Sequence, residues 1–79
     1  MGFKYEMTTH RLGVGMLFRF VVSSIPVNLL YSDLIRMIEY WCVDNIGDPA
    51  DYDIIETRMG CQVTIYDDIH ATAFRLTWM

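Results

Sequence analysis

Residues 14–22, VGMLFRFVV, are the segment that most restricts how this chain can fold. Successive side chains of a β-strand point to opposite faces of a sheet. In this segment one face would be wholly apolar, and the other would be apolar except for Arg19. A strand that is apolar on both faces is typical of the centre of a sheet. The sequence therefore predicts a sheet built around this segment, which Pro26 ends because proline cannot continue a ladder.

Three further segments have the features of strands. Residues 3–8 alternate between apolar and polar side chains, which indicates a half-buried strand. The segments YDIIETR and CQVTIY, residues 52–58 and 61–66, are rich in strand-forming residues and are separated by Met59 and Gly60. This pattern predicts a hairpin. Gly13 and Gly15 provide a turn between the first two strands.

The clearest helical pattern covers residues 32–45. Ser32 or Asp33 is expected to act as the N-cap, because a short side-chain oxygen can accept from the free N–H groups of a first helical turn. Gly47 and Pro49 would end the helix. The residues expected on its buried face follow helical spacing and are Leu34, Ile35, Ile38, Trp41 and Cys42.

The last segment, YDDIHATAFRLTWM, fits neither a pure helix nor a pure strand. We expect Asp67 or Asp68 to cap one or two helical turns through IHATA, after which the chain extends with alternate side chains inward. Together with one residue of the main helix, these inward side chains are the predicted structural anchors: Trp41, Phe74, Leu76 and Trp78. A buried aromatic end would keep the terminus from fraying.

The order of these patterns is β-β-α-β-β, followed by a short helical turn. It predicts one α+β domain over residues 1–79, with an antiparallel sheet of about four strands. One principal amphipathic helix would pack on one face of the sheet. The nearest architecture is a ferredoxin-like or split β-α-β fold.

Charge and hydropathy restrict the functional class. The net charge of −4 disfavours nucleic-acid binding, which depends on Lys and Arg to neutralise phosphates. No apolar run approaches the ~20 residues that span a bilayer, and the first ten residues lack the apolar region of a signal peptide. We therefore expect a cytoplasmic protein without a membrane partner.

Two cysteines and two histidines are the side chains best suited to metal binding or nucleophilic catalysis. Their spacing matches no zinc-binding pattern, and Cys42 falls on the buried face of the helix. Cys61 begins a strand and could be exposed, with His10 or His70 as its base. Nothing in the sequence indicates that these groups are adjacent. We assign no catalytic, cofactor-binding or metal-binding residue, and expect a protein that is not an enzyme.

An apolar content of 53% is high for a chain of 79 residues, because a small domain buries a modest share of its surface. Part of the apolar surface is therefore expected to contact a protein partner or a second copy. Some candidate contacts are apolar residues away from the core stripes, and others belong to the acidic window 39–56, which has no Lys or Arg. They are Tyr31, Met37, Tyr40, Met59, Asp44, Asp48 and Asp51.

The ending DDIHATAFRLTW resembles the endings of small, mostly uncharacterised accessory and early proteins of tailed bacteriophages. These often close with an acidic pair, a small-residue turn and a Phe-x-Leu-x-Trp end. The matching residues are Asp67, Asp68, Ala71, Phe74, Leu76 and Trp78. The resemblance implies a small protein in the host cytoplasm that binds a host or phage protein, as an inhibitor or regulator does. It implies no catalytic residue.

Together these observations predict a non-enzymatic, homo-oligomeric protein-binding module that acts by occluding its partner. An alternative from another class is a small-molecule or nucleotide binder with a pocket at a homo-oligomer interface. A third reading is an acidic DNA mimic, in which the carboxylates of residues 39–56 imitate phosphates.

Overall fold

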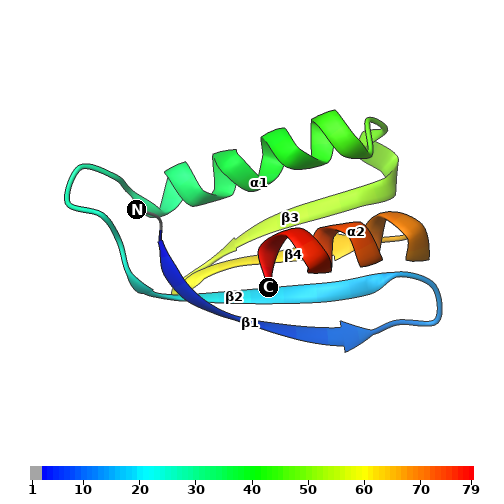
Figure 1. The fold of residues 1–79 in the computed structure, drawn as a ribbon, viewed down its shortest axis with the longest axis horizontal. Helices are drawn as coiled ribbons and strands as arrows, with labels where there is room; N and C mark the ends of the chain where they lie inside the picture. Colours follow the sequence, from blue (N-terminus) through cyan, green and yellow to red (C-terminus); the bar gives the residue numbers. More distant parts are fainter. Residues whose placement is uncertain (1–2) are drawn as a thin grey trace.

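The computed structural model describes residues 3–79, which form two helices packed on a four-stranded sheet (Figure 1). These elements confirm the predicted α+β class with an antiparallel sheet of four strands. In chain order the elements are β1 (Lys4–Arg11), β2 (Met16–Ser24), α1 (Tyr31–Asn45), the short 3-10 turn η1 (Pro49–Asp51), β3 (Tyr52–Thr57), β4 (Gly60–Ile65) and α2 (Asp68–Trp78).

The strands lie in the order β1-β2-β4-β3, and every neighbouring pair is antiparallel. β2 is therefore an inner strand, as its two apolar faces predicted. Because β4 is antiparallel to both β2 and β3, these two run parallel to each other and are connected by α1, which is the split β-α-β arrangement. Ferredoxin-like folds have the order β-α-β-β-α-β. Here the strand that would close that order, β1, comes first.

Both helices cover the same face of the sheet (Figure 1). On the opposite face Arg19 and Val21 are exposed and Leu17 is half-buried, so this face is open to solvent. The central strands consequently bury alternate side chains, as expected for an antiparallel sheet with one covered face. The buried residues of β2 and β4 on the covered face are Met16, Phe18, Phe20, Val22, Cys61, Val63 and Ile65.

Aromatic rings fill the space between α2 and the sheet. The ring of Phe74 lies 4.7 Å from that of Phe18 and 5.2 Å from that of Trp41, measured between centroids. Trp78 meets Phe20 edge-on at 6.1 Å. Tilted and edge-on arrangements of this kind are the favoured geometries of aromatic pairs. Phe74 is fully buried, whereas Trp41 and Trp78 are partly buried against the core.

The end of the chain differs from the expected short turn and extended tail. α2 is a continuous helix of 11 residues, from Asp68 to Trp78. Phe74 and Trp78 are four residues apart and so share the face that packs on the sheet, while Leu76 points the other way. Leu76 is 69% exposed, so the prediction that it anchors the core was wrong.

α1 begins one residue before the predicted helix, and its N-cap is Leu30 rather than Ser32 or Asp33. The Asp33 carboxylate instead accepts a hydrogen bond of 2.7 Å from the backbone N–H of Leu30. The predicted inner face is correct: Leu34, Ile38 and Cys42 are buried, with Ile35 and Trp41 partly buried beside them. Within residues 3–79, no helix is both long enough and apolar enough to cross a membrane.

Candidate protein-interaction surface

The outer side of α1 presents apolar side chains to solvent. Met37 is 47% exposed and Tyr40 is 61% exposed. These two residues and Asp44 follow at intervals of three and four along α1, so they form one stripe on the helix surface. Trp41, next to this stripe, packs against Phe74 of α2. We call Met37, Tyr40 and Asp44 the α1 stripe.

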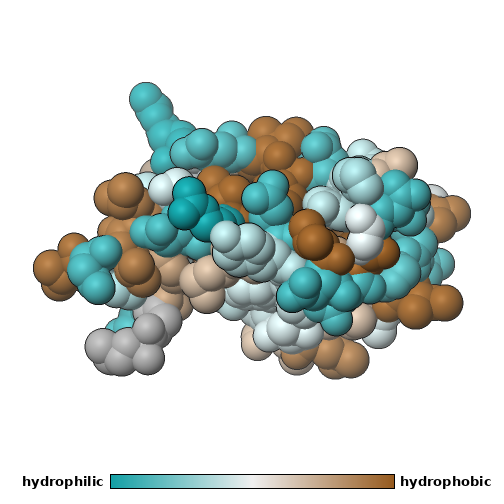
Figure 2. Space-filling model, turned by 90° about the horizontal axis from the view of Figure 1, so that it is seen from above, coloured by the Kyte–Doolittle hydropathy of each residue, from teal (hydrophilic) through white to brown (hydrophobic). Residues whose placement is uncertain are grey.

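Figure 2, seen from the side on which α1 lies, shows apolar patches interrupting a largely polar surface. Val43, on the last turns of α1, adds a further exposed apolar side chain beside Tyr40. α1 has 15 residues and is apolar on its inner face and partly apolar on its outer face. Part of its apolar surface therefore lies outside the core of the domain. Such surface commonly marks a site of protein contact.

Negative charge gathers where α1 ends. The last turn of α1 contains no basic residue, although the carbonyl groups at a helix C-terminus carry partial negative charge and favour cations. Asp44 lies in this turn, and Asp48 follows three residues after the helix. This end of α1 would therefore favour a Lys or Arg supplied by another molecule.

Two of the predicted acidic contacts also have structural roles. The carboxylate of Asp48 accepts from the backbone N–H of Ala50 at 2.9 Å and so caps η1. Asp51 is half-buried, and its carbonyl oxygen accepts from the backbone N–H of Tyr66 at 3.0 Å. Asp44 has the clearest position for an external contact, because it lies exposed on the α1 stripe.

The remaining apolar candidates lie elsewhere. Tyr31 is the first residue of α1, where it is 36% exposed. Met59 is exposed in the turn between β3 and β4, and its carbonyl oxygen accepts from the backbone N–H of Val22 at 2.8 Å. The structure therefore groups Met37, Tyr40 and Asp44, and leaves Met59 outside that group.

The outer face of α2 is a second exposed apolar surface, and it was not among the predicted contacts. Ile69, Thr72, Ala73 and Leu76 are all exposed and follow helical spacing on the side of α2 opposite Phe74. We call these four residues the α2 stripe. Its signal in the sequence is the 3-4 spacing of Ile69, Ala73 and Leu76, which has meaning only if residues 68–78 are helical throughout.

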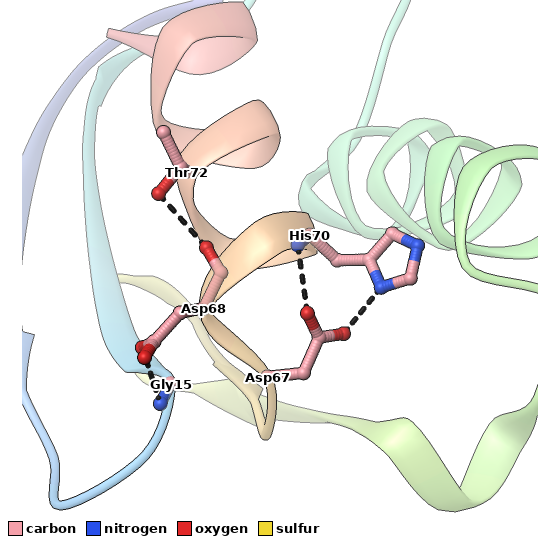
Figure 3. Close-up of polar contacts among 5 residues, drawn as sticks. All are labelled: Gly15, Asp67, Asp68, His70 and Thr72. Atoms are coloured by element: carbon pink, nitrogen blue, oxygen red, sulfur yellow. Dashed lines mark hydrogen bonds and ion pairs between the residues drawn. The ribbon is translucent and has the colours of Figure 1, made fainter.

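The acidic pair Asp67 and Asp68, the N-cap and first residue of α2, fixes the start of that helix (Figure 3). One carboxylate oxygen of Asp67 accepts from the backbone N–H of His70 at 3.0 Å, and the other bonds to the imidazole Nδ1 of the same residue. The backbone hydrogen bond is the main cause that lowers the pKa of Asp67 below its ordinary value. Asp67 is therefore the helix cap, one of the two residues predicted for that role.

Asp68 ties α2 to the turn between β1 and β2. Its carboxylate accepts from the backbone N–H of Gly15 at 2.9 Å (Figure 3). It also lies 4.0 Å from the Arg11 guanidinium. Gly15 has a φ of +82°, and a Cβ atom there would lie 1.9 Å from the carbonyl oxygen of Ile65. Only glycine fits this position. The polar residues at the start of α2 therefore hold the fold together through these contacts.

Both cysteines are buried, including Cys61, whose exposure the sequence left open. Burial raises the pKa of the Cys42 thiol to about 11 and that of the Cys61 thiol to about 12, with smaller contributions from Glu39 and Glu56 respectively. Reactive cysteines have the opposite shift and are accessible. Residues 3–79 also enclose no pocket, and no three metal-ligating side chains gather among them.

Comparisons with protein-family models, with curated proteins and with solved structures found no match to this chain.

Proposed function

We propose that this protein is a non-enzymatic protein-binding module whose partner docks on the α1 stripe. The observation behind the proposal is the exposure of Met37 and Tyr40 on the outer side of a helix whose inner face already fills the core. Methionine adapts to irregular surfaces, and tyrosine combines a large apolar ring with a hydroxyl group. Both residue types are enriched at the centres of interfaces.

The charge at the end of α1 defines the partner further. Asp44 and the C-terminal carbonyl groups of α1 would accept a Lys or Arg that borders an apolar patch on the partner. Following the resemblance of its C-terminal segment to phage proteins, we take the partner to be a host or phage protein that is inhibited by occlusion. A compact module acts in this way when it covers a surface that the partner needs for another contact.

The test compares three tagged proteins in pull-downs from infected and uninfected bacterial lysates, read by quantitative mass spectrometry. They are the natural chain, a Met37→Ser/Tyr40→Ser variant and an Ile55→Ser variant. Ile55 is the matched control, because it is an exposed apolar residue on the open face of the sheet.

We expect the natural chain and the Ile55→Ser variant to enrich the same protein, and the double variant to lose it. The captured protein, once purified, should bind with a dissociation constant that Asp44→Asn raises and that added salt raises. If the double variant, folded by circular dichroism, still captures that protein at full level, the α1 stripe is not the docking site.

A further inference from the structure

Ile69 and Leu76 of the α2 stripe are the most exposed large apolar side chains on the described helices and strands. Ile69 is 81% exposed on the first turn of α2, and Leu76 is exposed on the last. Between them lie two smaller residues, Thr72 and Ala73. The core side of α2 already packs on the sheet through Ala71, Phe74 and Trp78, so the stripe points away from the rest of the domain.

The spacing of the α2 stripe is the same in both directions along the helix. Its residues follow at intervals of three, one and three, in the order large, small, small, large. If two copies of α2 lie antiparallel across a two-fold axis between Thr72 and Ala73, Ile69 of each copy meets Leu76 of the other. The smaller residues at the centre then let the two helices approach closely. A two-fold contact needs a surface that is complementary to itself, and this pattern has that property.

Charges beside the stripe are arranged in the same way. Asp68 and Arg75 are seven residues apart and so lie on one flank of α2. In the antiparallel arrangement, Arg75 of each copy comes near Asp68 of the other on that flank. The Asp68 side chain is 55% exposed, which leaves it accessible to such a partner beyond its contacts with Gly15 and Arg11.

We infer that the α2 stripe is a homodimer interface, in which two copies of this chain pack antiparallel through α2. The contact is independent of the partner proposed for the α1 stripe, because it involves a different helix. Standard interfaces bury about 800 Å² per partner. The four residues of the α2 stripe cover only part of such an area. The dimer should therefore be weak, forming at high protein concentration and dissociating on dilution.

The first experiment measures mass in solution by sedimentation equilibrium from low micromolar to submillimolar concentrations. The natural chain should fit a monomer–dimer equilibrium. Leu76→Asp should raise the dissociation constant at least about tenfold. Ile55→Asp, which places the same charge on the open face of the sheet, should leave it unchanged. Arg75→Glu should weaken the dimer more at low salt than at high salt.

The second experiment traps the dimer by oxidation. Both natural thiols are buried, so an added cysteine would be the reactive one. Ala73→Cys, next to the two-fold axis, should form a disulfide-linked dimer in dilute oxidant, whereas Thr8→Cys on the open face of the sheet should not. A monomeric mass over the whole concentration range, an oligomer larger than a dimer, or equal cross-linking of the two cysteine variants would overturn the proposal.

Discussion

At the scale of single residues, Phe74 and Leu76 occupy opposite environments on one helix. Phe74 is fully buried among aromatic rings, and Leu76 is in solvent. We expect Phe74→Ala to lower the free energy of unfolding by about 3–5 kcal/mol, because it leaves a cavity in the core. Leu76→Ala should change it by less than about 0.5 kcal/mol. Urea unfolding at low protein concentration, where the chain is monomeric, measures both values.

The comparison has a built-in control. Alanine has the highest helix propensity, so neither substitution weakens α2 through its backbone. A loss of stability in Leu76→Ala comparable to that in Phe74→Ala would mean that Leu76 packs against the domain after all.

Asp67 should stabilise the fold chiefly as a helix cap. Asp67→Ala removes the acceptor for the His70 backbone N–H and should cost about 1 kcal/mol. Asp67→Asn keeps an acceptor and should cost less at neutral pH. Because folding lowers the pKa of Asp67 below its ordinary 3.8, its charge stabilises the folded state above that value. This contribution is lost as the pH falls through the folded pKa.

Urea unfolding at neutral pH and at acid pH separates the two contributions. The natural chain should lose more stability on acidification than Asp67→Asn, which has no carboxylate to titrate. Identical acid profiles would show that the capping geometry acts without its charge.

At the scale of elements, α2 completes the core although it comes last in the chain. Deleting residues 74–79 removes Phe74 and Trp78 from the aromatic cluster. We expect the truncated chain to unfold or aggregate, because the covered face of β2 and β4 is then exposed to water. Circular dichroism and light scattering measure this outcome.

Deleting Met79 alone is the matched control, since this residue is exposed. It should leave the fold intact. A soluble, cooperatively folded product of the longer deletion would show instead that α2 is an appendage to a core formed without it.

The elements differ in how far local sequence determines them. The period-2 alternation of residues 14–22, with no charged residue on the core face, was enough to predict β2. Helical spacing, ended by Gly47 and Pro49, was enough to predict α1. In the last segment, Phe74, Leu76 and Trp78 alternate as in a strand, while Phe74 and Trp78 also have helical spacing. Over so few residues the two periods cannot be separated. Tertiary packing decides: in the helix Phe74 packs against Phe18 and Trp78 against Phe20, while Leu76, which a strand would place beside them, lies in solvent.

Of the two candidate surfaces, one could be found from the sequence and the other could not. Met37 and Tyr40 could be selected from the sequence because the core stripe of α1 was clear, and residues off that stripe had to face outward. The α2 stripe could not be selected, because its recognition depends on the helix that local pattern failed to establish. The exposure of Cys61 stayed open, since the start of a strand gives no sign of which face the sheet will cover; the structure buries it.

At the scale of the whole molecule, the two buried thiols couple stability to alkaline pH. In the unfolded chain they would ionise near the ordinary pKa of 9.0, whereas the folded values are about 11 for Cys42 and about 12 for Cys61. Between these values the unfolded state binds fewer protons, so stability falls as the pH rises above 9.0. The slope should approach about 1.4 kcal/mol per pH unit for each thiol.

Urea unfolding between neutral pH and the alkaline range measures this slope in the natural chain and in a Cys42→Ala/Cys61→Ala variant. The variant has a lower absolute stability through lost packing, but its alkaline slope should be smaller. Equal slopes in the two proteins would assign the alkaline loss to other groups, such as Tyr5, whose pKa burial also raises.

The hydroxyl group of Tyr5 donates a hydrogen bond of 2.7 Å to the carbonyl oxygen of Trp78, which joins the first strand to the end of the last helix. A linker from the end of α2 to the start of β1 would therefore join neighbouring parts of the molecule. The chain could then be reopened at the exposed Gly13, where β1 turns into β2. The resulting circular permutant would read β-α-β-β-α-β, the ferredoxin-like order, with every strand pairing retained. This domain and a ferredoxin-like one then differ by where the backbone is cut.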